Sequence, residues 1–125
     1  MDKEEQKAID LAFQYKREEH YKKSVDQFKY VLNRYGENSG IVGMIGLLTV
    51  VELKDYTSAL PFAKRYAELE PNSERASFNL FLCLSNLENE KEAEDEVKRY
   101  VQTGNKLDLY NTLFEENNLS VSDFN

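Results

Sequence analysis

The side chains that could perform acid–base or nucleophilic chemistry are few in this sequence. His20 is the only histidine, and it follows two glutamates near the end of a predicted helix. No nucleophile lies at a recognisable spacing from it, so His20 is expected to be a solvated turn residue. Cys83 lies between two leucines and is expected to be a small buried side chain. We therefore predict no catalytic residue and no enzymatic activity.

Sites for metals, cofactors and phosphate are not indicated either. One cysteine and one histidine cannot form a zinc site, and a single cysteine excludes an internal disulfide, which fits a reducing compartment. Gly40, Gly43 and Gly46 recur at every third position, but no predicted strand precedes them and no Gly-Lys-Ser/Thr follows them. Their spacing favours close helix packing over a phosphate-binding loop. We expect neither a metal nor a cofactor.

Charge is distributed unevenly along the chain. The formal net charge is −7, and residues 72–125 carry eleven acidic and five basic side chains. The run over 88–96 reads Glu-Asn-Glu-Lys-Glu-Ala-Glu-Asp-Glu. Such a run is typical of a solvated helix face, and a contact for a basic partner is the second interpretation. The acidity argues against a phosphate backbone as ligand, so no nucleic-acid partner is expected.

Composition predicts one globular domain outside the membrane. Hydrophobic residues make up 41% of the 125, and the mean hydropathy is −0.67. The sequence from Met1 lacks the apolar stretch of a signal peptide. The longest apolar run, 41–51, has eleven residues, whereas roughly 20 are needed to span a bilayer. We expect no membrane insertion and a cytoplasmic location.

The elements that would position any site recur with a period of 35 and then 34 residues. Such a period is typical of stacked helix pairs, none of which buries its apolar face alone. The recurring positions are Tyr21 and Tyr56; Ser24, Ala59 and Ala93; and Val31, Tyr66 and Tyr100. We predict seven helices and no strand: 2–19, 21–35, 39–53, 56–69, a fifth after 72–73, a sixth between 89 and 104, and 106–117. Asp2 with Glu5 and Asn89 with Glu92 have the spacing of capping boxes, and the tail is expected to be frayed.

These residues resemble the tetratricopeptide repeat over about 5–107. The resemblance implies an all-α fold, a right-handed α-solenoid of three antiparallel helix pairs with a seventh, capping helix. The single domain 1–125 would hold repeats at about 5–38, 39–72 and 73–106, a cap helix at 106–117 and a tail at 118–125. The matching residues are Ala8, Leu11, Ala12, Tyr15, Tyr21, Ser24, Phe28 and Val31; Gly43, Gly46, Leu47, Val50, Tyr56, Ala59, Ala63, Tyr66 and Pro71; and Ser77, Leu80, Phe81, Leu84, Ala93, Val97 and Tyr100. Leu47 and Phe81 depart from the small residue usual at that position.

The first helix of each unit carries a second apolar stripe beside the one that packs inside the unit. In the family that the chain resembles, this second face lines a concave groove. An apolar face of that size exceeds what a monomer usually exposes. The residues expected to line the groove are Ile9, Phe13, Ile41, Met44, Leu48, Val51, Phe78 and Leu82, with Arg75 and Asn79 as polar members. Family members that grip a terminal carboxylate need charged or amide side chains where this chain has Ile9, Phe13 and Ile45, so that function is not expected, although Arg75 and Asn79 could hold one acidic or backbone group.

The second stripe predicts a protein-interaction module, such as an adaptor, a chaperone or a subunit of a complex. Its groove would bind an apolar helical or extended segment of another protein. Two other ways of covering the stripe stay open. The C-terminal segment with Leu107, Tyr110, Leu113 and Phe114 could fold against the groove, or the curvature of the solenoid could bury it. Alternatively, the protein could be a structural homodimer that associates through the groove or the last helix.

Overall fold

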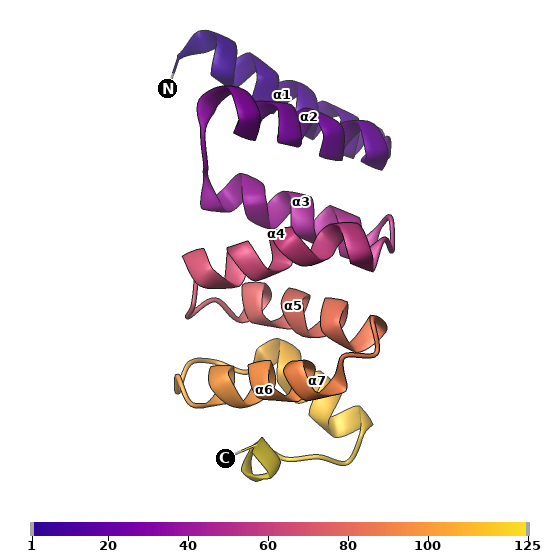
Figure 1. Ribbon diagram of the computed structural model, residues 1–125, viewed down its shortest axis with the longest axis vertical. Helices are drawn as coiled ribbons and strands as arrows, with labels where there is room; N and C mark the ends of the chain where they lie inside the picture. Colours follow the sequence, from indigo (N-terminus) through magenta and orange to yellow (C-terminus); the bar gives the residue numbers. More distant parts are fainter. Residues whose placement is uncertain (1, 125) are drawn as a thin grey trace.

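The computed structural model describes residues 2–124, which form seven α-helices and one short 3₁₀ helix with no strand among them. Figure 1 shows the helices stacked along one axis. They are α1 (Lys3–Arg17), α2 (Tyr21–Tyr35), α3 (Ser39–Val51), α4 (Tyr56–Leu69), α5 (Glu74–Asn86), α6 (Glu90–Val101), α7 (Asp108–Glu116) and the 3₁₀ helix η1 (Val121–Phe124). The predicted all-α class is confirmed. None of these helices is long and apolar enough to cross a bilayer.

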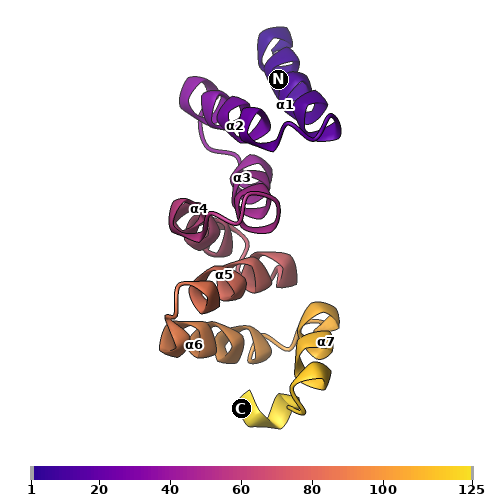
Figure 2. The ribbon, with the colours of Figure 1, turned by 90° about the vertical axis from the view of Figure 1, so that its right-hand side faces the viewer.

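The helices form two layers, which the side view in Figure 2 separates. The odd-numbered helices α1, α3, α5 and α7 make one layer, and α2, α4 and α6 make the other. Each of α1, α3 and α5 packs against the even-numbered helix that follows it, and α2 and α4 also pack against the next odd-numbered helix. This is the predicted solenoid of three antiparallel helix pairs.

Side-chain caps define where four of the helices begin. Asp2 accepts a hydrogen bond of 2.6 Å from a backbone N–H in the first turn of α1, and Asn38, Asp55 and Ser73 cap α3, α4 and α5 in the same way. Each bond satisfies one of the free N–H groups at a helix start. Asn89 is the N-cap residue of α6 as predicted, but the predicted capping box is wrong, because the Asn89 side chain makes no capping hydrogen bond. Acidic residues in the first turn of α6 instead stabilise the start of the helix, because they interact favourably with the positive end of its dipole.

Inside each pair the chain reverses at a residue with a left-handed backbone. These residues are Glu19 (φ 61°), Lys54 (φ 52°) and Glu88 (φ 60°). The turns after α1 and α5 are three residues long, whereas the turn after α3, residues 52–55, is one residue longer. If the repeats are aligned on their second helices, the extra residue shifts the positions of α3 by one. With 3.6 residues per helical turn, this shift rotates the faces of α3 by about 100°. The faces of α3 therefore differ from those that a uniform period of 35 predicts.

Two opposite faces of α3 are buried. On the face toward α4, a Cβ added at Gly43 would lie 2.7 Å from the ring of Tyr66, and one added at Gly46 would lie 3.5 Å from the backbone of Ala63. The aromatic ring thus occupies the space that a side chain at Gly43 would need. The opposite face enters a core shared with α1 and α2, through Ile41, Ile45 and Leu48. The predicted use of these glycines in close helix packing agrees with this geometry.

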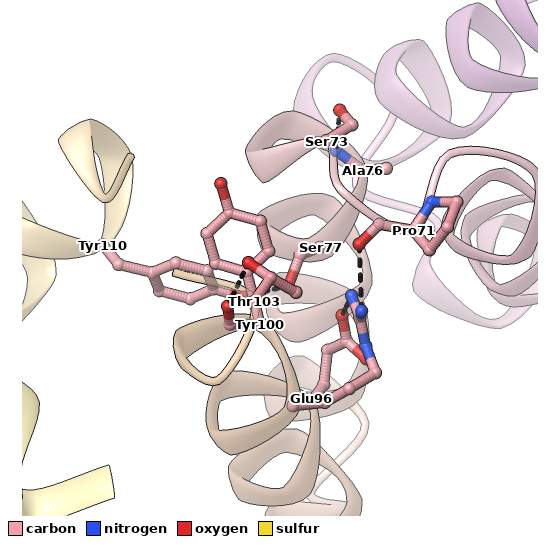
Figure 3. Close-up of polar contacts among 9 residues, drawn as sticks. Pro71, Ser73, Ala76, Ser77, Glu96, Tyr100, Thr103 and Tyr110 are labelled. Carbon is pink, nitrogen blue, oxygen red and sulfur yellow. Dashed lines mark hydrogen bonds and ion pairs between the residues drawn. The ribbon is translucent and has the colours of Figure 1, made fainter. Parts of the chain in front are cut away.

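Buried polar contacts attach α7 to α5. The Glu74 carboxylate in α5 accepts hydrogen bonds from the backbone N–H groups of Leu109 (2.8 Å) and Tyr110 (3.0 Å). No side chain at the start of α7 makes a capping hydrogen bond, so Glu74 provides the cap from the neighbouring helix. The Tyr110 hydroxyl lies 2.7 Å from the Ser77 hydroxyl in the interior, as Figure 3 shows. α7 therefore continues the layer of odd-numbered helices.

The residues after α7 also pack against the domain. Asn118 has a φ of 55°, which repeats the left-handed turns inside the three pairs. The Leu119 N–H donates to the Phe114 carbonyl at 2.8 Å, and η1 follows. The rings of Phe124 and Phe114 stack with centroids 5.0 Å apart and an interplanar angle of 14°. The expectation of a frayed tail is wrong for 118–124, because this aromatic stack and the turn hold the segment.

Candidate functional site

An apolar groove lies on the odd-numbered layer, between α3, α5 and the start of α7. Its volume is about 360 Å³, near the lower end of the range for ligand sites. Val51 and Leu109 stand at its edge and are 47% and 43% exposed, unusually high for large apolar side chains. Its lining residues are Leu47, Val51, Arg75, Phe78, Asn79, Leu82 and Leu109. We refer to these seven residues as the groove.

Five of these residues were predicted from the sequence, and two were not. Leu47 was expected to pack inside its own pair, but the longer turn after α3 rotates that helix and brings Leu47 beside Val51 at the groove. Leu109 belongs to the helix that was expected to be a cap, for which the repeat pattern assigns no groove position. The predicted residues that line the groove are Val51, Arg75, Phe78, Asn79 and Leu82.

The other five predicted groove residues lie elsewhere. They belong to the core between the first two helix pairs, in which Ile9, Ile41 and Leu48 are 9%, 7% and 3% exposed and two half-buried side chains, Phe13 and Met44, pack against them. The prediction that these residues line an open groove is therefore corrected. This apolar stripe on α1 and α3 serves packing between repeats, and Leu11, expected to face inward, is 36% exposed.

Asn79 is the unusual member of the groove. Its residue is 3% exposed, and neither Oδ1 nor Nδ2 has a hydrogen-bond partner among residues 2–124. A Cβ added at Gly46 would lie 3.0 Å from Nδ2, so the carboxamide rests against the backbone of α3. Leaving such a polar group buried and unpaired costs about 1–3 kcal/mol. A group retained at this cost is a candidate contact for a ligand.

Arg75 lies one helical turn before Asn79 and is exposed. It takes part in none of the ion pairs formed within residues 2–124. The groove thus combines an apolar lining with one carboxamide and one guanidinium on the same side of α5. Such a set can orient a peptide segment by hydrogen bonds while apolar contacts hold it.

A larger polar cleft of about 540 Å³ adjoins the groove and shares Arg75 and Leu109 with it. Two of its buried polar groups are engaged within the protein. Glu74 caps α7, and the Tyr100 hydroxyl donates to the Lys106 carbonyl at 2.7 Å. Burial raises the pKa of the Tyr100 hydroxyl, which favours this neutral, donating form. The cleft therefore extends the trough beyond the apolar groove without adding a group poised for proton transfer.

The described residues contain no arrangement suited to covalent or metal chemistry. No group of three potential metal ligands occurs within residues 2–124. Cys83 is buried and donates to the Tyr56 carbonyl at 3.1 Å. Burial raises the pKa of its thiol, which disfavours the reactive thiolate.

Comparison with solved structures finds the same helical stack in other proteins. YrrB, described as a TPR protein with an unusual peptide-binding site, is 30% identical in sequence and superimposes with a TM-score of 0.67 over 73% of this chain and 46% of its own. A mutant of MamA and a MamA structure labelled MSR-1 are 24% and 23% identical, both with a TM-score of 0.68 over 76% of this chain and 55% and 54% of their own. No protein-family model matches the sequence, and neither does any curated protein.

The chain spans about half the length of these structures. The two MamA structures, at less than 25% identity, show a shared fold. YrrB adds a moderate sequence similarity, and it is described as a TPR protein with a peptide-binding site. Together the superpositions confirm the predicted α-solenoid.

Proposed function

Because this chain has the fold of the tetratricopeptide-repeat proteins, we propose that it is a protein-interaction module whose groove binds a short apolar segment of a partner protein. It would act as an adaptor, a chaperone or a subunit of a complex. The observation that carries the proposal is an exposed apolar lining that surrounds one buried carboxamide without a hydrogen-bond partner. The described peptide-binding site of YrrB supports the same class of ligand.

We further propose that the bound segment is extended. The backbone groups of a helix are already paired with one another, so a helix cannot satisfy the Asn79 side chain with its backbone. An extended segment leaves its N–H and C=O groups free, and a carboxamide offers both a donor and an acceptor to them. Binding would require Asn79 to turn toward the groove, which exchanges an unpaired state for a paired one.

The apolar lining determines which side chains of the bound segment must be apolar. Alternate residues of an extended chain point the same way, so every second side chain would face the groove. Each leucine- or phenylalanine-sized anchor contributes about 1.5–3 kcal/mol on burial, before the cost of association. Val51 from α3 and Leu109 from α7 both line the groove, are exposed, and would contact such anchors. Binding therefore depends on three helices at once.

Selection from a phage-displayed peptide library tests the proposal. The double variant Val51→Asp/Leu109→Asp changes two side chains that are already 47% and 43% exposed, so the helical content should be unchanged. Peptides that bind the wild-type chain should lose affinity for this variant by at least about tenfold. They should carry apolar residues at alternating positions. Tyr30→Asp, at a position in α2 that is 50% exposed and outside the groove, is the matched control and should bind as the wild type does.

Three results would contradict the proposal. The first is a selection that enriches no peptide. The second is a set of peptides with apolar residues at spacings of three and four, which indicates a helical ligand. The third is an equal loss of binding in the double variant and in Tyr30→Asp, which would indicate non-specific adhesion.

A homodimer formed through the groove or the last helix is the second candidate function. The same exposed side chains at the groove rim favour it. Sedimentation over a series of protein concentrations distinguishes the two functions. A chain that stays monomeric excludes the dimer under those conditions, whereas a dimer that dissociates in Val51→Asp/Leu109→Asp would replace the peptide-binding proposal.

A further inference from the structure

A second apolar cavity lies near the end of α7, where the solenoid reaches its C-terminal end. It occupies about 310 Å³ between α5, α6, α7 and η1. Its apolar lining consists of Phe81, Ala93, Val97, Leu113, Leu119 and Phe124. None of these residues lines the groove, and Leu119 is 41% exposed. We refer to this cavity as the end cleft.

The end cleft exists because the third pair departs from the repeat at two positions. Tyr21 in α2 and Tyr56 in α4 pack in cores that they share with the next odd-numbered helix. The equivalent residue in α6, 34 positions after Tyr56, is Glu90. One turn later, Leu60 of α4 is replaced by Glu94 of α6 in the same way. A glutamate cannot be buried without a partner, so α7 packs on α5 while η1 packs against α6, and the cavity remains between these elements.

The rim of the end cleft is negatively charged. Glu90 takes part in none of the ion pairs formed within residues 2–124, and Glu94 has only an exposed pair with Lys98 at 3.1 Å. Residues 88–98 contain six acidic and two basic side chains. An apolar cavity under an acidic rim is complementary to a surface that presents apolar side chains flanked by lysine or arginine.

The polar side chains at the end cleft indicate which conformation its ligand would have. Asn117, its polar member on α7, donates to the Leu113 carbonyl at 2.8 Å. The only buried side-chain polar atoms of residues 2–124 without a partner belong to Asn79 in the groove, so none lies here. An extended ligand would find no buried group that needs its backbone, whereas a helix brings its backbone already paired. The end cleft therefore suits a helical ligand.

We propose that the end cleft is a second docking surface, which binds a basic amphipathic helix of a partner protein. The helix inserts one or two apolar side chains between α6 and α7 and places a lysine or arginine beside Glu90. Its contacts on α6 are the exposed side chains of Glu90 and Glu94, whereas Ala93 and Val97, which are 3% and 1% exposed, form the floor of the cavity. This surface is independent of the groove, and both could be occupied at once.

The test uses a synthetic 18-residue amphipathic helix with leucine on one face and lysine on its flanks. A second peptide, in which every lysine is replaced by glutamate, is its control. Amide chemical shifts of the ¹⁵N-labelled chain locate the peptide, and fluorescence anisotropy gives its affinity. The lysine peptide should shift amides in 90–97 and 113–124 and leave those of 47–51 unchanged. The glutamate peptide should not bind.

Variants of the chain separate docking from general charge attraction. Glu90→Lys should weaken the lysine peptide by roughly fivefold or more, because it replaces a favourable pair with a repulsive one. Glu18→Lys changes the net charge equally at an exposed position directly after α1, the helix at the opposite end of the solenoid, and should have little effect. Leu119→Asp should weaken binding without changing the helical content. The groove variant Val51→Asp/Leu109→Asp should bind the lysine peptide normally.

Several outcomes would overturn the proposal. These are no binding of the lysine peptide, shifts spread over the acidic surface, or equal effects of Glu90→Lys and Glu18→Lys. Self-association of the chain that Leu119→Asp abolishes would assign the end cleft to a second copy of this protein. Because the groove variants and the end-cleft variants alter different residues, failure here leaves the proposed function of the groove unaffected.

Discussion

Replacing Asn79 with leucine should make the free protein more stable and abolish binding in the groove. The Asn79 carboxamide is 3% exposed, and both of its polar atoms lack partners. Leucine has the same branching, with two methyl groups in place of Oδ1 and Nδ2, so Asn79→Leu removes the unpaired atoms and keeps a similar shape. The variant therefore isolates the energetic consequence of the orphaned amide.

The expected stabilisation follows from the desolvation of that amide. An unsatisfied buried polar group costs about 1–3 kcal/mol, and Asn79→Leu removes this cost. Burial of the two methyl groups adds to the gain, while their larger radius crowds Gly46, since a Cβ there would already lie 3.0 Å from Nδ2. We expect a net gain of about 1–3 kcal/mol in the free energy of unfolding. For a chain of 125 residues this corresponds to a rise in Tm of about 4 °C per kcal/mol.

Urea and thermal unfolding followed by circular dichroism measure this effect. Asn86→Leu is the matched control, because it is the same substitution in the same helix at an exposed position. That control should change stability by no more than about 0.5 kcal/mol. A peptide selected for the groove should bind Asn79→Leu at least about tenfold more weakly than the wild type. A Tm below that of the wild type, or unchanged peptide affinity, would refute the assigned role of Asn79.

Three further predictions concern the elements around the groove. Glu74→Ala should destabilise the protein by about 1–3 kcal/mol and speed hydrogen exchange of the first amides of α7, because it removes both capping bonds. Glu74→Gln keeps one acceptor and should destabilise the protein less. Burial raises the pKa of Tyr110 above the 10.0 of a free tyrosine, so the contribution of the neutral hydroxyl to stability is full below pH 10 and is lost as the pH rises. The free energy of unfolding, measured in urea, should therefore depend less on pH between 9 and 11 in Tyr110→Phe than in the wild type or in Tyr30→Phe. Gly43→Ala should cost about 1–3 kcal/mol in urea unfolding, because its Cβ would lie 2.7 Å from the Tyr66 ring.

The sequence was a good guide to the helices because local signals determine them. α2 and α4 begin and end at the predicted residues, and Asp2 caps α1 as its spacing to Glu5 predicts. The ends that were predicted less well depend on contacts between distant residues. α7 starts at Asp108, two residues later than expected, because the cap comes from Glu74 in α5. No pattern within 106–117 contains that information.

The groove was harder to predict because a helix face depends on rotation. A second apolar stripe looks the same in sequence whether it faces a partner or the next repeat. On α1 and α3 the stripe with Ile9, Ile41 and Leu48 packs between the repeats. The extra residue in 52–55 turns α3 by about 100° and places Leu47 in the groove. The left-handed turn residues that mark this shift and the unpaired state of Asn79 both require coordinates.

The position of α7 decides which of the possible coverings of the groove can occur. Tyr110 and Phe114 are 0% and 2% exposed and are held in the aromatic cluster between α5, α6 and η1, so this helix cannot also fill the groove. Its only groove residue is Leu109, whose own backbone N–H donates a hydrogen bond to the Glu74 carboxylate. The C-terminal helix therefore lengthens the groove, and its rim stays open to another molecule. A ligand that contacts α3, α5 and Leu109 would bind only the state in which α7 is docked, so peptide binding should slow hydrogen exchange throughout α7 although that helix contributes a single side chain to the site.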